Sequence, residues 1–133
     1  MLYWTFCWNG SPGILKPRLF LAFQKKLINC FVSASSITDI FYLAEKEHGK
    51  QTARDSIKRL LQVFNPATVT SANIRQALEL KWNDFEDSLQ FIVGESLSVD
   101  FIVTRNVKDF TSSTIVVVTP AQFIQHIAEI SEQ

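Results

Sequence analysis

The chain has 133 residues, of which 47% are hydrophobic, and this is enough for the core of one domain. Thirteen basic residues balance thirteen acidic ones, which excludes a strong overall positive field, so any contact with nucleic acid has to be local. No apolar run approaches the ~18 residues of a membrane span. With no sign of a signal peptide, we expect a cytoplasmic protein whose two cysteines, Cys7 and Cys30, are reduced.

The first clearly patterned segment is a short apolar strand predicted over residues 31–33, which is followed by a helix. Ser35 or Ser36 is expected to cap this helix, and Gly49 is expected to end it. Asp39 would then lie in the first turn of the helix.

A second helix is predicted over residues 52–63, where apolar side chains recur at helical spacing. Asn65 and Pro66 are expected to end it. A strand is then predicted over residues 67–70, and Ser71 is expected to cap a short helix.

The next helix is predicted to begin at Asn83 or Asp84 and to run to about Leu97. Its apolar residues recur along one side. Asp84, Asp87 and Gln90 are expected to share the opposite, polar side.

Two runs of β-branched residues, 100–104 and 115–119, are typical of buried parallel strands. Pro120 is expected to begin a final helix. The alternation of strands and helices predicts an α/β fold with a parallel sheet and right-handed crossovers.

Acidic and polar residues gather in two segments, NDFEDSLQ over residues 83–90 and DFIVTRNVKDF over residues 100–110. Hard cations such as Mg²⁺ take oxygen ligands. An apolar strand that ends abruptly in polar residues delivers such ligands to one edge of a sheet. The pattern therefore indicates a divalent-metal site.

Together with VSASSITDI over residues 32–40, these segments resemble the PIN-domain family, the nuclease fold of the VapC-type toxins of toxin-antitoxin pairs. The resemblance extends from about residue 31 to about residue 123, with three motifs in the family's order and spacing. It implies a three-layer fold with strand order 3-2-1-4-5 and a ribonuclease that depends on Mg²⁺ or Mn²⁺. Many VapC-like proteins form dimers and are neutralised by a cognate antitoxin, so the resemblance implies both partners beside the RNA substrate.

Asp39 matches the family's second acidic position and Asp87 matches the third, so the resemblance implies that both are catalytic residues and metal ligands. Taken alone, Asp39 would be an acid near a helix start that favours the helix dipole, and Asp87 would be a capping residue. Asp84 lies one turn before Asp87, where it either supports the site or caps the helix.

Asn106 occupies the fourth position, where its side-chain oxygen can bind a metal or a metal-bound water without adding charge. Asp109 either supplies an acid to the catalytic site or is a turn residue. Thr104 resembles the family's Ser/Thr that hydrogen-bonds a ligating carboxylate or water. We expect Asp39 and Asp87 to converge with Asn106 or Asp109 on one pocket at the carboxyl ends of the strands.

Residues 1–26 depart from the family pattern, because they contain no Asp or Glu and the central first strand that ends in Asp is missing or replaced. Reading the codons of residues 3–9 from the third base of the Tyr3 codon gives Leu-Asp-x-Leu-Leu-Glu, whatever synonymous codons are chosen, and this resembles the family's first helix. We therefore interpret residues 1–26 as a frameshifted leader, with the original first strand upstream, and residues 27–133 as the PIN-like domain. A divergent native leader is the alternative. Residues 2–7, which are rich in aromatic and apolar side chains, can substitute as a strand but bring no carboxylate.

The missing first acid predicts impaired metal binding and impaired catalysis. The alternative function is a non-catalytic PIN-like remnant that binds RNA or a protein partner without cutting. A flavodoxin-like ligand-binding domain ranks last, because four glycines supply no Gly-rich phosphate loop.

Overall fold

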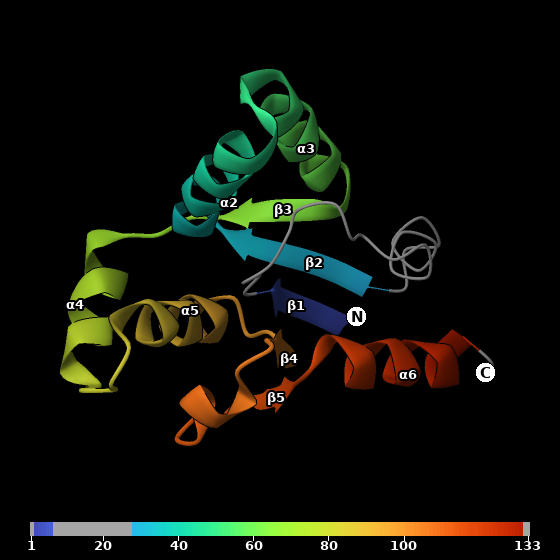
Figure 1. The fold of residues 1–133 in the computed structure, drawn as a ribbon. Coiled ribbons are helices and arrows are strands. Elements are labelled where there is room, and N and C mark those ends of the chain that lie inside the picture. Colours follow the sequence, from blue (N-terminus) through green and yellow to red (C-terminus); the bar gives the residue numbers. More distant parts are fainter. Residues whose placement is uncertain (1, 7–27, 132–133) are drawn as a thin grey trace.

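A computed structural model describes residues 2–6 and 28–131, which form a parallel sheet between two layers of helices (Figure 1). The five strands have the order β3-β2-β1-β4-β5, which confirms the predicted α/β fold. Their bounds are Leu2–Phe6 for β1, Ile28–Ser33 for β2, Phe64–Ala67 for β3, Phe101–Val103 for β4 and Val116–Val118 for β5. No helix among the described residues is long and apolar enough to cross a membrane.

The centre of the sheet is occupied by β1, so the family's first strand is replaced rather than missing. Trp4 pairs with Cys30 of β2 on one side and with Phe101 of β4 on the other. The five residues of β1, LYWTF, include no acid. The predicted leader over residues 1–26 otherwise lies outside the described residues.

One face of the sheet is covered by α2 (Ala34–His48), α3 (Lys50–Val63) and α6 (Pro120–Ser131) (Figure 1). Ile40, Leu60 and Phe123 bring these three helices onto Val32 and the neighbouring strand residues. The buried thiol of Cys30 belongs to this core and forms no disulfide. Burial raises its pKa to about 12, so the thiol stays protonated and unreactive.

The other face of the sheet is covered by α4 (Ser71–Glu79), α5 (Phe85–Ser96) and the short 3₁₀ helix η1 (Val107–Phe110). Trp82 ties this layer together. Its ring stacks on Phe91 at 5.0 Å between centroids and meets the edge of Phe110 at 5.7 Å. Because α5 is held in this way, the position of its first turn is fixed relative to the loop that follows β4.

The helix caps differ in part from the sequence prediction. The N-cap of α2 is Ser33, not Ser35 or Ser36, and α4 is capped by Thr70, not Ser71. The predicted stop at Gly49 is confirmed, with a φ of 87° that glycine adopts without strain.

Two positional expectations were also wrong. Because α2 begins at Ala34, Asp39 lies in its second turn, where the helix dipole gives an acid little stabilisation. Gln90 is not on a polar side of α5, because every residue from Ser88 to Gly94 is buried.

Candidate metal-binding site

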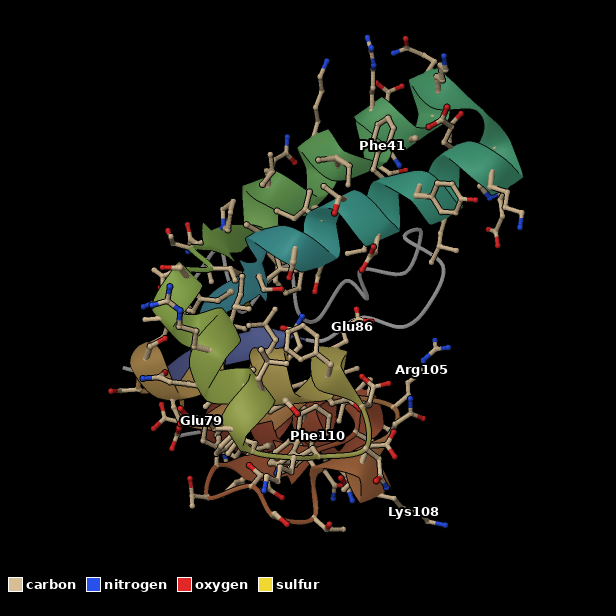
Figure 2. All side chains as sticks on the ribbon, turned by 90° about the vertical axis from the view of Figure 1, so that its left-hand side faces the viewer. Phe41, Glu79, Glu86, Arg105, Lys108 and Phe110 are labelled. Atoms are coloured by element: carbon tan, nitrogen blue, oxygen red, sulfur yellow. The ribbon has the colours of Figure 1, made fainter. Side chains whose placement is uncertain are left out.

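Several acidic residues belong to elements near the carboxyl ends of the strands, the end of the sheet that faces the viewer in Figure 2, where Glu86 is labelled. They come from three elements: Asp39 from α2, the N-cap Asp84 and first-turn Glu86 and Asp87 from α5, and Asp109 from η1. Figure 2 shows Glu86 on the side of α5 that faces α2. This is the sheet edge at which open parallel folds bind ligands.

Asp84 is the N-cap of α5, which confirms one of the two predicted starts of this helix, Asn83 or Asp84. Its carboxylate accepts a hydrogen bond from the backbone N–H of Asp87 at 3.0 Å, and its carbonyl accepts one from the Ser88 hydroxyl at 3.0 Å. Capping thereby places three carboxyl groups within one helical turn. The amino-terminal end of the helix dipole offsets part of their mutual repulsion.

Glu86 connects α5 to α2. Burial is the largest cause of its raised pKa, and the next causes are the charge of Asp39 and a side-chain hydrogen bond with the same residue. Asp39 and Glu86 are therefore neighbours across the two helices, and we call them the acid pair.

Asp87 is surrounded by the other acids of this edge. Burial, followed by the charges of Asp84, Asp109 and Glu86, raises its pKa to about 6. The structure therefore brings Asp109 of η1 into the electrostatic surroundings of α5. Among the neighbouring acids, Asp39 raises the pKa of Glu86, and Asp84 and Asp109 contribute most to raising that of Asp87.

The loop after β4 is held by Thr104, whose side chain is 1% exposed. Its hydroxyl accepts a hydrogen bond from the backbone N–H of Asn106 at 3.1 Å, and the Asn106 carbonyl accepts one from the N–H of Asp109 at 3.0 Å. Thr104 thus shapes the turn that carries Asn106 and Asp109. The predicted bond from Thr104 to a ligating carboxylate or water stays a prediction.

These residues have the chemistry that a hard cation requires, because carboxylate oxygens predominate and the neighbouring charges that act on Glu86 and Asp87 are those of other acids. Over residues 2–6 and 28–131, however, no three His, Cys, Asp or Glu side chains form a group that could hold a metal ion. The PIN-domain pattern that the sequence resembles has one more acid at the end of the first strand, and β1 supplies none. The residues present therefore fit a divalent cation in kind but form an incomplete set.

Sequence reasoning missed Glu86, which lies between two residues that it singled out. An acidic residue at the second position of a helix was the only available signal, and such residues usually serve the helix dipole. The pairing with Asp39 depends on how α2 and α5 approach each other, which is not a local property of either segment.

A five-stranded parallel sheet in the order β3-β2-β1-β4-β5 between helical layers, with acids near the carboxyl ends of its strands, is the arrangement that the PIN-domain resemblance predicts. The family model described as "PIN domain" matches residues 9–108, and the chain belongs to the PIN-domain family. The search of curated protein sequences gave no match.

Solved structures of toxin-antitoxin proteins have a similar fold. VapBC2 from Rickettsia felis, bound to a DNA fragment of its promoter, matches with a TM-score of 0.69 and 12% identity over 88% of this chain and 97% of that chain. A toxin-antitoxin complex from Klebsiella pneumoniae matches with a TM-score of 0.60 and 19% identity over 90% of this chain and 98% of that chain. VapC20 from Mycobacterium tuberculosis, a toxin that cleaves the sarcin-ricin loop, matches with a TM-score of 0.58 and 18% identity over 85% of this chain and 96% of that chain.

Proposed function

We propose that this protein is a divalent-metal-dependent ribonuclease of the PIN type and the toxin component of a toxin-antitoxin pair. The observation that carries the proposal is the group of acids at the carboxyl ends of the strands, in which burial, followed by the charges of neighbouring acids, raises the pKa values of Glu86 and Asp87. Crowded acids are costly to a fold, and such perturbed groups concentrate at functional sites.

In this proposal Asp39 and Asp87 are the metal ligands, and Asn106 and Asp109 complete the catalytic residues. Thr104 and Asp84 support them by holding the β4 loop and the start of α5. Bound Mg²⁺ or Mn²⁺ would lower the pKa of a water molecule and stabilise the charge that develops on a phosphate.

The side chains have to release protons before they can bind the ion, because only carboxylates are good ligands. Asp87, with a pKa of about 6, is mainly ionised at neutral pH and protonated below pH 6. Glu86 is held protonated to a higher pH than usual by its burial and by Asp39. Metal binding is therefore expected to weaken as the solution becomes more acidic.

The proposed partners are RNA as the substrate, a cognate antitoxin and a second copy of the chain. The support is that the structural neighbours include a toxin that cleaves the sarcin-ricin loop and two toxin-antitoxin assemblies. The proposed location is the cytoplasm, in line with the reduced thiol of Cys30.

The second candidate function is RNA or protein binding without cleavage. It is favoured by one specific observation, the absence of any acid from β1, at whose end the family carries its first ligand. Metal dependence separates the two functions, since binding without cleavage needs no ion.

The proposal is tested with Asp39→Asn and Asp87→Asn, each of which removes one ligand charge and keeps the size of the side chain. Cleavage of labelled RNA in Mn²⁺ should fall by at least ~100-fold in both variants. Asp55→Asn is the matched control, because Asp55 is exposed on α3 and its printed bond is with Gln51 on the same helix. Circular dichroism should be unchanged in all three variants.

Cleavage at the wild-type rate by both site variants would show that the site has been misplaced. RNA binding that persists without any cleavage by the wild-type protein would favour the second function.

A further inference from the structure

A buried polar cluster joins α2 to α5 beneath the acidic residues. It consists of Ser33, Ser36 and Gln90. The Ser33 and Ser36 hydroxyls are 2.8 Å apart, and the Gln90 amide donates to both, at 2.8 Å to Ser33 Oγ. Ser33 and Gln90 are separated by 57 positions in the chain, so this contact forms only when the two helices dock.

Packing alone does not account for Gln90. Its side chain is 2% exposed, within a stretch of α5 that is otherwise occupied by apolar or small residues. Its amide oxygen has no hydrogen-bond partner among the described residues, although buried polar groups are almost always satisfied. An unbranched apolar side chain of the same length would fill this space at lower cost to the fold.

The placement of the cluster relative to the acids supplies an explanation. Ser36 lies one helical turn before Asp39 on α2, and Gln90 lies one turn after Glu86 and Asp87 on α5. The hydrogen bond from Gln90 to Ser36 therefore connects α5 to α2 one helical turn away from the acid pair, Asp39 and Glu86.

We propose that Gln90 is a positioning residue which, through Ser36 and Ser33, fixes the spacing of Asp39 from Glu86 and Asp87 and thereby prepares these acids for a divalent cation. This inference rests on the proposed metal site but not on RNA cleavage. It assigns Gln90 no contact with metal or substrate, because the residue is buried.

The first experiment uses Gln90→Met, which keeps length and volume but loses both hydrogen bonds. Val93→Ala is the matched control, since Val93 is fully buried on the same helix and belongs to the apolar core. Gln90→Met should bind Mn²⁺ ~10- to 100-fold more weakly than the wild-type protein, with an unchanged or higher urea midpoint of unfolding. Val93→Ala should show the reverse, with a lower midpoint and unchanged Mn²⁺ affinity.

A second measurement needs no metal. In NMR spectra of the metal-free protein, Gln90→Met on α5 should move the amide signal of Asp39 on α2, and Ser36→Ala on α2 should move those of Glu86 and Asp87 on α5. Ser36→Thr, which keeps the hydroxyl, should restore the wild-type Mn²⁺ affinity that Ser36→Ala loses. Combining Ser36→Ala with Gln90→Met should weaken binding no further than either change alone.

Wild-type Mn²⁺ affinity in Gln90→Met, or an Asp39 signal that does not move, would overturn the positioning role. A loss of affinity in Val93→Ala as large as that in Gln90→Met would also overturn it, because general destabilisation would then suffice. If the wild-type protein binds no Mn²⁺, the proposed function fails, and the cross-helix NMR shifts alone decide the role of Gln90.

Discussion

Asp87 holds its proton more tightly in the folded protein than in the unfolded chain, with a pKa raised from 3.8 to about 6. A raised pKa means that the contribution of this group to stability is fully present below pH 3.8 and is lost as the pH rises through 6. At neutral pH the ionised Asp87 therefore opposes folding. In the proposed function, a bound cation would offset this cost by neutralising the carboxylates.

Replacing Asp87 with Asn should consequently stabilise the fold at pH 7, by up to about 1 kcal/mol after allowance for solvent screening. The gain should disappear below about pH 4, where the wild-type carboxyl is protonated. Urea unfolding of both proteins at several pH values measures the difference. Lower stability of the variant at pH 7 would contradict the crowding of acids around this position.

Single residues were predictable where the chemistry is local. Asp84 as a helix cap followed from the sequence, because capping depends on neighbours within one turn. Gln90 did not, since a glutamine in a helix is ordinarily exposed and its burial arises from contacts with Ser33 and Ser36 on another element. Glu86 was missed for the same reason.

At the scale of elements, the first turn of α5 has two roles. The turn caps the helix, and it presents acids to the sheet edge. The segment that follows is buried on all sides, which anchors the acids on a rigid support.

Two substitutions of Asp84 should separate these two roles. Asp84→Ala should lower the free energy of unfolding by about 1 kcal/mol, because the bond to the Asp87 N–H is lost. Asp84→Asn retains a capping oxygen and should leave stability nearly unchanged while lowering the pKa of Asp87, to which the Asp84 charge contributes. Chemical denaturation and an NMR titration measure the two effects. Equal stability of the two variants would show that the cap contributes little.

Strand boundaries were the least predictable elements. The strand predicted over residues 67–70 lies three residues earlier, as β3, and it contains Pro66. Proline looked like a terminator, but β3 is an edge strand, where a missing N–H is tolerated. Pairing of Phe64 with Cys30 sets the register, and that partner is far away in the sequence.

At the scale of the whole molecule, all five strands of the expected order are present, but the acid expected at the end of the first strand is absent from β1. The strand order was predictable from the alternation of elements and the family resemblance, whereas the identity of the central strand was not. The aromatic β1 has no counterpart in the pattern on which that resemblance was recognised.

Placing an acid at the end of β1 should therefore improve the site. Phe6 is the last residue of β1 and pairs with Val103, immediately before Thr104. Phe6→Asp should tighten Mn²⁺ binding by ~10-fold or more by adding a ligand charge, and Phe6→Asn, which adds none, should not. Isothermal titration with Mn²⁺ compares the two variants. Equal affinities would argue against a ligand position at this end of the strand.

The central position of β1 also determines the order in which the fold can form. Trp4 pairs with Cys30 early in the sequence, but its other partner, Phe101, lies about 100 residues later. During synthesis from the amino terminus, β1 can join β2 but presents an open edge until β4 has been made. Asp109 follows β4 in the chain, so it can join Asp87 only after β4 has been made. Partly synthesised chains therefore expose an unpaired strand and have no completed acidic site.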